Sequence, residues 1–128
     1  MLRTIGWGIL ATVSAGRPYA VPVGYALGDD CVFVASGSGQ KLMNLEANPV
    51  ACLTVCDVDT YDSWRSVVIQ GAATEVVGPM ARTPAIAAFV MQRSPRGATG
   101  ADMKRLLSAR IFRIPLAGMS GKERGTRD

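Results

Sequence analysis

The residues best suited to bind a ligand lie in one run, CVFVASGSGQKLMNLEANP, between Cys31 and Pro49. Apolar residues typical of a β-strand come first, followed by a Gly/Ser loop and by Lys41 at the beginning of a short helix. Asn48 and Pro49 then end that helix. Backbone N–H groups at a helix N-terminus, together with hydroxyls and an ammonium group, are typical ligands of phosphate. The run therefore predicts a phosphate-binding loop.

The strand expected before this loop, Tyr19 to Leu27, carries Pro22 and Gly24. A proline cannot donate to a β-ladder, so its position is a sheet edge, a bulge or a gap that faces a ligand. Glycine lets a flat ligand approach the backbone closely. Together with the loop, this strand predicts a small β-barrel that holds a phosphorylated ring cofactor.

Several other chemistries fit the chain poorly. The loop is not a P-loop, because Lys41 has neither a glycine directly before it nor a Ser or Thr directly after it. The chain has no histidine, which excludes histidine acid–base catalysis, Ser-His or Cys-His pairs and histidine-ligated metals. Asp57, Asp59 and Asp62 do not meet the spacing of a Ca²⁺ loop. We therefore predict no metal site, and no side chain stands out as a catalytic group.

The composition indicates one domain that associates with a second copy. Of the 128 residues, 48% are hydrophobic and only 19% are charged. A small monomer with so few charges would expose apolar surface, and a homodimer interface is the simplest cover. No window is long and apolar enough to span a membrane and no secretory signal is evident, so we expect a cytoplasmic protein. An odd number of cysteines in apolar strands predicts buried free thiols at Cys31, Cys52 and Cys56.

The net charge of +4 suits an anionic cofactor or substrate. The arginines are scattered and no basic run alternates with aromatic residues, so we do not expect nucleic-acid binding. The densest basic cluster lies at the C-terminus. We expect residues 1–118 to form the domain and residues 119–128 to form a solvated, partly mobile basic tail.

The pattern predicts six strands and about three short helices. The first three strands are separated by tight turns, and such a meander favours an antiparallel sheet. The fold class is therefore α+β, a six-stranded antiparallel barrel with short flanking helices. The expected strands are 8–14, 19–27, 31–36, 50–58, 64–76 (bent at Gly71) and 108–116; a polar loop is expected at 57–63; the expected helices are 39–47, 83–92 (with Thr83 as N-cap and Pro84 at its first position) and 101–107.

An ordered set of motifs resembles one known family. The set comprises LAT from Leu10, PYAVPVGY from Pro18, the Gly/Ser loop before Lys41, NPV from Asn48, RSVVIQGAATEV from Arg65, and Gly121-Lys122. It resembles the pyridoxamine 5′-phosphate oxidase-like split β-barrel flavoproteins, and within them the branch that includes nitroimidazole-reductase-like proteins. The order of the motifs carries the resemblance, since NP and Gly-Lys are common dipeptides.

The resemblance implies two FMN molecules at a homodimer interface, each in contact with both subunits. Trp64 is either an edge aromatic or a neighbour of the flavin ring held by the partner. The other implied cofactor residues are Val21, Pro22, Val23, Gly24 and Tyr25 along the ring, Ser36, Gly37, Ser38, Gln40 and Lys41 around the phosphate, and Ser66 and Val67 on a neighbouring strand.

The sequence also departs from the family. Many members of this branch carry a histidine where Val34 stands, and true oxidases have further Arg and His substrate ligands, so we do not expect pyridoxal phosphate synthesis. The first hypothesis is an FMN-dependent oxidoreductase that passes electrons from NAD(P)H to a nitroaromatic, a quinone or another flavin. The alternatives are a flavin- or haem-binding carrier without turnover, a reductase that uses the deazaflavin F420, and a dimer that has lost its cofactor. The missing histidine argues against ordinary haem ligation.

Overall fold

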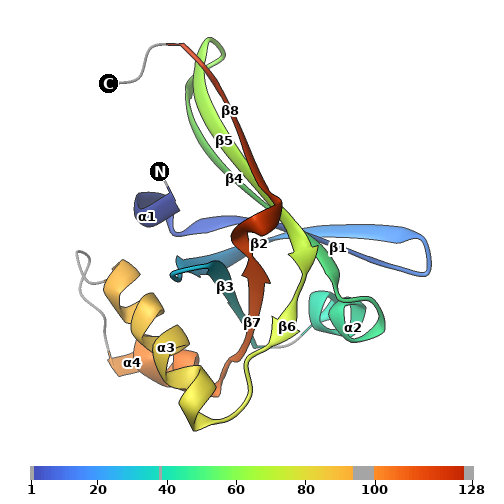
Figure 1. Cartoon of the computed structure of the whole chain (residues 1–128), viewed down its shortest axis with the longest axis vertical. Helices are drawn as coiled ribbons and strands as arrows, with labels where there is room; N and C mark the ends of the chain where they lie inside the picture. The colour runs from blue at the N-terminus through green and yellow to red at the C-terminus, as the bar shows by residue number, and fades with distance from the viewer. Residues whose placement is uncertain (1, 38, 94–99, 126–128) are drawn as a thin grey trace.

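A computed structural model describes residues 2–37, 39–93 and 100–125 of the chain. In these residues eight β-strands form one antiparallel sheet, which curls into part of a barrel (Figure 1). The order across the sheet is β6-β7-β3-β2-β1-β4-β5-β8. The strands are β1 (Trp7–Ser14), β2 (Arg17–Leu27), β3 (Cys31–Ser36), β4 (Val50–Thr60), β5 (Ser63–Ala72), β6 (Thr74–Glu75), β7 (Arg110–Pro115) and β8 (Met119–Arg124).

The helices lie at two places around the sheet. Figure 1 shows α3 and α4 together on one side, whereas α2 lies at another end of the barrel. The helices are α1 (Leu2–Ile5), α2 (Gln40–Ala47), α3 (Pro79–Arg93) and α4 (Gly100–Ser108), and the short 3-10 turn η2 (Leu116–Gly118) follows β7. Within the described ranges, no helix has the length and apolar character needed to cross a membrane. The α+β class and the antiparallel sheet are confirmed, but the expected count of six strands is wrong.

One extra strand comes from the segment that we expected to be a single strand, 64–76. β5 stays paired with β4 as far as Ala72, which lies opposite Val50. The N–H of Ala73 then donates to the carbonyl of Pro49 at 2.8 Å. Beyond it, β6 pairs with β7 instead of β4. The curl of the sheet thus brings the residues after β5 next to β7, which lies at the other end of the strand order. No local sequence pattern encodes this contact.

The other extra strand lies in the expected basic tail. Met119–Arg124 forms β8, which pairs antiparallel with β5 so that Lys122 lies opposite Ser66. All six residues of β8 are exposed. The strand therefore has no apolar alternation to reveal it, and backbone pairing to the otherwise open edge of β5 explains its place.

Two further boundaries differ from the expectation. α3 begins at Pro79, directly after Gly78 with φ +90°, and Pro84 lies inside the helix. Thr83 is therefore not an N-cap; its hydroxyl donates to the carbonyl of Pro79 at 2.7 Å. The polar residues 57–63 form the end of the β4–β5 hairpin instead of a loop. Thr60 pairs with Ser63 beside the turn, and Asp57 lies opposite Arg65 of β5, with which it forms an ion pair at 3.0 Å.

Apolar residues are buried on both sides of the sheet. The inner cluster fills the barrel, and α2 contributes Leu42 and Leu45 to it. The outer cluster lies where α3 and α4 cover β2, β3 and β7; it contains Phe33, Phe89 and Ile111. Cys31 belongs to this outer cluster, whereas Cys52 is half-buried and Cys56 is exposed, so the expectation of three buried thiols is wrong for Cys56.

In the part of the chain that the structure describes, no helix covers the outer face of β1 and β4 in this way. Along β1, Leu10 points into the barrel while its neighbours Trp7 and Ile9 point outward and are 56% and 36% exposed. Val58 on β4 is 66% exposed. Helices of the same chain thus cover the outer face of β2, β3 and β7, whereas β1 and β4 expose several apolar side chains.

We expect the substitution Gly118→Ala to destabilise the fold. A Cβ at Gly118 would overlap the backbone carbonyl oxygen of Gln70, and overpacking against backbone costs about 1–3 kcal/mol. Thermal unfolding followed by circular dichroism should show a lower Tm. The control is Gly71→Ala, whose Cβ would meet Ile114 at an ordinary 3.5 Å. Equal Tm values for the two variants would contradict the close packing of Gly118 in η2 against the backbone of Gln70 in β5.

Candidate functional site

The predicted phosphate loop joins the end of β3 to the N-terminus of α2. Gly39 precedes α2 with φ +127° and ψ −169°, a conformation that favours glycine. Among the described residues no side chain caps the helix, so none of them occupies the N–H groups of its first turn. A Cβ at Gly37 or Gly39 would meet no atom within 4 Å outside the neighbouring residues, so the space beside these two glycines is open. Ser38 lies outside the described residues.

Ser36 adds a hydroxyl to this loop. Its Oγ is buried and has no hydrogen-bond partner in the described part of the chain. A buried hydroxyl without a partner costs free energy, so such a group commonly marks the place of a ligand or a water. Lys41, in the first turn of α2, is half-buried and forms no ion pair with the described carboxylates. The loop therefore offers amides, a hydroxyl and an ammonium group to an anion.

The predicted ring-binding residues lie on β2, directly beside this loop. Ala35 pairs with Gly24, so the following residue, Ser36, lies next to Val23. β3 pairs with β2 only from Gly24 to Leu27. The backbone of β2 before Gly24, including Val21 and Pro22, therefore has no strand partner on that side. Of the three possibilities for Pro22, the structure supports a sheet edge.

Side chains alternate along this part of β2. Pro22 and Gly24 face outward, whereas Val23 and Tyr25 point into the barrel. The Tyr25 hydroxyl donates to the carbonyl of Leu2 at 2.6 Å, which ties α1 to the barrel. Burial raises the pKa of Tyr25 above its ordinary value. The Tyr25 side chain is thus part of the core, and only its backbone is close to the loop.

The predicted residues on β5 lie apart from this group. Val23 pairs with Gly8, and Val67 pairs with Val55, so two strands, β1 and β4, separate Val23 from Val67. Three strand spacings amount to about 14 Å along the sheet. Trp64 and Ser66 lie still further along β5, on the arm formed by β4, β5 and β8 (Figure 1). The structure therefore brings together the β2 and α2 residues, but not the β5 residues of the same chain.

Arg110 at the start of β7 is a site neighbour that the sequence did not reveal. It pairs with Ser36 across the β3–β7 ladder. Its guanidinium donates to Glu75 at 2.7 and 3.0 Å and to Glu46 of α2 at 2.7 Å. These hydrogen bonds from Arg110 lower the pKa of Glu75, and they raise the pKa of Arg110. The three charges come from segments far apart in the chain, so no sequence motif could predict the cluster.

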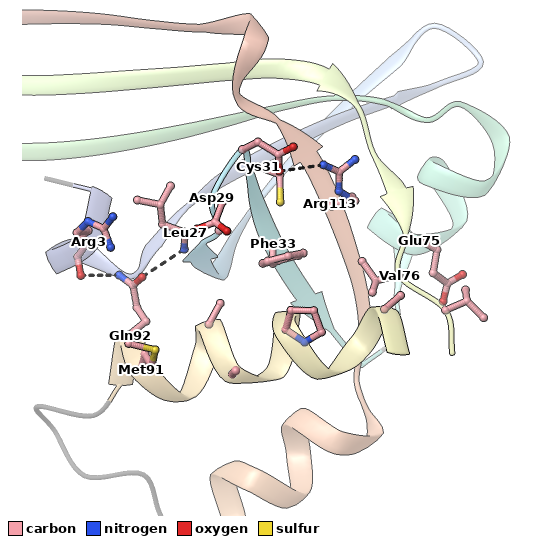
Figure 2. A pocket seen from close by; sticks show the side chains of 17 residues that line it. Arg3, Leu27, Asp29, Cys31, Phe33, Glu75, Val76, Met91, Gln92 and Arg113 are labelled. Carbon is pink, nitrogen blue, oxygen red and sulfur yellow. Dashed lines mark hydrogen bonds and ion pairs between the residues drawn. The ribbon is translucent and has the colours of Figure 1, made fainter. Parts of the chain in front are cut away.

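A separate cavity of about 910 Å³ lies between α3 and the turn from β2 to β3 (Figure 2). Phe33, Val76 and Met91 contribute apolar surface. The side-chain amide of Gln92 accepts a hydrogen bond from the N–H of Leu27 and donates one to the carbonyl of Arg3. None of the predicted cofactor residues lines this cavity. Its acidic and basic side chains are mixed, so it does not have the one-signed charge of a phosphate site.

Comparison with known proteins establishes the family. A family model described as pyridoxamine 5′-phosphate oxidase matches residues 1–123, and the chain belongs to this family. The resemblance inferred from the ordered motifs is therefore confirmed. In a part of 67 residues, which is 52% of this chain, an uncharacterised protein of Rhizobium meliloti (strain 1021) is 31% identical. The matched part spans only 44% of that relative.

Solved structures show the same architecture. An FAD-binding protein from Mesorhizobium loti is similar with a TM-score of 0.74 and 26% identity, over 97% of this chain and 90% of that chain. A protein of Bacteroides thetaiotaomicron provisionally assigned to 5-nitroimidazole antibiotic resistance has a TM-score of 0.74 and 18% identity, over 94% of this chain and 77% of that chain. The second likeness, at this identity, concerns the fold alone.

The Arg110 cluster predicts a pH-dependent difference in stability. Because the pKa of Glu75 is lowered in the folded state, its contribution is present above the ordinary pKa of about 4.5 and is lost as the pH falls through the lower folded value. Thermal unfolding between about pH 3 and pH 6 should therefore show a smaller loss of Tm on acidification for Glu75→Gln than for the unchanged protein. Asp59→Asn, an exposed carboxylate on β4, is the control. Identical acid profiles for Glu75→Gln and the unchanged protein would contradict the role of the ion pair.

Proposed function

We propose that the chain binds a flavin nucleotide beside β2 and α2 and acts as an oxidoreductase that passes electrons from NAD(P)H to a small acceptor. The observation that carries the proposal is the uncapped N-terminus of α2 beside the unpartnered hydroxyl of Ser36. The FAD-binding relative from Mesorhizobium loti supports a flavin. We propose FMN as the flavin, with FAD as the alternative that this relative favours.

The residues of the loop fit a flavin phosphate. The first-turn amides of α2 and the positive end of its dipole would face the phosphate oxygens. Lys41 would add a charge-assisted hydrogen bond, and Ser36 would gain the partner that its buried hydroxyl lacks. The glycines at 37 and 39 leave the space that the phosphate needs.

The ring would lie along the open edge of β2. Unpaired backbone groups near Val21 and Pro22 would orient it by hydrogen bonds, and the outward-facing Gly24 would allow close approach. When bound, the flavin supplies the redox chemistry. The protein would contribute binding, orientation and exclusion of water, while the acceptor is a nitroaromatic, a quinone or another flavin.

A second copy of the chain would complete the site. The uncovered outer face of β1 and β4 exposes Trp7, Ile9 and Val58, which suits a homodimer interface. The residues of β5 implied by the family lie about 14 Å along the sheet from β2 of the same chain. A partner could bring its own Trp64 and Ser66 to the flavin that the first copy holds.

The direct test is an absorbance spectrum of the purified protein before and after addition of FMN, with the released chromophore identified by mass. Bands near about 375 and 450 nm would support the proposal, and the mass would separate FMN from FAD. Rapid reduction of the bound flavin by NAD(P)H in a stopped-flow trace would separate an oxidoreductase from a carrier. A colourless protein that binds neither FMN nor FAD would overturn the proposal and direct attention to F420 or to a dimer without cofactor.

Lys41→Ala should weaken FMN binding by about 1.5–3 kcal/mol, the range of a charge-assisted hydrogen bond. This corresponds to an increase in Kd of roughly 10- to 150-fold. Titration of protein into FMN, followed by quenching of flavin fluorescence, measures the change. Lys104→Ala, an exposed lysine on α4, is the matched control. An unchanged Kd for Lys41→Ala would remove Lys41 from the site.

Ile9→Glu should weaken the homodimer, because it places a charge in the centre of the uncovered face. Sedimentation velocity should then show the monomer of 13.5 kDa, and flavin affinity should fall with it. Leu107→Glu replaces an apolar residue of α4 that is also exposed, outside this face, and should leave the assembly unchanged. A dimer that persists in Ile9→Glu would place the interface elsewhere.

A further inference from the structure

A chain of side-chain hydrogen bonds links the barrel to the N-terminus of α2. The amide nitrogen of Asn44 donates to the Thr12 hydroxyl at 3.0 Å, and the amide nitrogen of Gln40 donates to Oδ1 of Asn44 at 2.8 Å. Thr12 and Asn44 are each only 3% exposed, and they are the two polar residues classed as buried in the described ranges. A polar pair inside an apolar core therefore leads directly to the predicted phosphate loop.

The helix that this chain holds is short and depends on the barrel. An isolated helix of eight residues is not stable in water, so contacts with the barrel must maintain α2. Leu42 and Leu45 supply apolar contacts, each being 5% exposed. Apolar contacts have little directional preference, whereas a hydrogen bond fixes distance and angle. Asn44 is thus the buried polar contact that can set the rotation of α2 about its own axis, whereas the bond of Glu46 with Arg110 is open to solvent.

The series of hydrogen bonds ends at Thr12, on a strand that is paired on both sides. Thr12 lies on β1, which pairs with β2 on one side and with β4 on the other, and Thr12 itself lies opposite Tyr19 and Ala51. Because Gln40 and Asn44 are four residues apart, they share one face of α2. The hydrogen bonds from Gln40 to Asn44 and from Asn44 to Thr12 therefore fix the direction of the first turn of α2 relative to the central strand β1.

We propose that Thr12 and Asn44 are positioning residues for the flavin phosphate. They hold α2 so that its first-turn amides, Gln40 and Lys41 meet the phosphate, and neither residue touches the cofactor itself. The inference rests on the proposed function, because it concerns how that site is built. It assigns to two buried residues a specific effect on phosphate recognition that is separate from their contribution to stability.

The test compares FMN with riboflavin, which has the same ring but no phosphate. Thr12→Val keeps the side-chain shape and removes the hydroxyl acceptor. The ratio of the Kd of riboflavin to the Kd of FMN, measured by flavin fluorescence, should fall about tenfold, with the Kd of riboflavin unchanged. Thr12→Ser retains the hydroxyl and should keep the ratio of the unchanged protein.

Two controls separate positioning from stability. Ile69→Val removes a methylene group from the same barrel core, where Ile69 is fully buried, and should lower Tm without changing the ratio. Glu46→Gln weakens the ion pair of α2 with Arg110, in which the Glu46 side chain is 60% exposed, and should also keep the ratio. If Thr12→Val does not fold, Asn44→Ala removes both hydrogen bonds from the helix side and has the same expected result.

The outcomes distinguish this inference from the proposed function. If the unchanged protein binds FMN no better than riboflavin, the phosphate site itself is wrong. If the unchanged protein prefers FMN and Thr12→Val or Asn44→Ala preserves that preference, the positioning role is overturned while the site stands. An equal loss of preference in Ile69→Val would also overturn it, because the effect would then follow stability alone.

Discussion

The alternation of side chains along β1 is the constraint on which the rest of the structure depends. β1 lies in the middle of the sheet, and its side chains point alternately into the barrel and toward the outer face of the sheet. Leu10 fills the core, and Thr12 on the same side receives the hydrogen bond that anchors α2. Trp7 and Ile9 are exposed by the same alternation. One strand thus determines both where α2 is held and which apolar side chains are left exposed on the outer face.

The proposed flavin site depends on two elements whose backbone groups are left open, the strand β2 and the N-terminus of α2. β2 extends beyond its pairing with β3, which leaves an open backbone edge before Gly24. α2 begins without a side-chain cap, which leaves its amides open. The two lie next to each other because Ser36 ends β3 at the point where β2 loses its partner. A phosphorylated ring would satisfy both, with the phosphate at α2 and the ring along β2.

The local parts of this arrangement could be predicted from the sequence. The strand over residues 31–36, the Gly/Ser loop and the helix that ends before Asn48 follow from short-range patterns, and the ordered motifs identify the family. The contacts between distant segments could not. β8 is fully exposed and carries no periodic signal. β6 is defined by partners 37 and 39 residues away, because Glu75 pairs with Phe112 and Thr74 pairs with Arg113. The polar pair of Thr12 and Asn44 likewise joins residues 32 positions apart.

The most direct test of the central claim is a two-dimensional ¹H–¹⁵N NMR titration of the protein with FMN and, in parallel, with riboflavin. The claim predicts that FMN causes the largest amide shifts at Gly37, Gly39 and the first turn of α2, and that riboflavin affects β2 without these loop shifts. Shifts that instead gather around Phe33 and Val76, in the cavity beneath α3, would contradict the claim, since the ligand would then bind on the helix-covered side of the sheet.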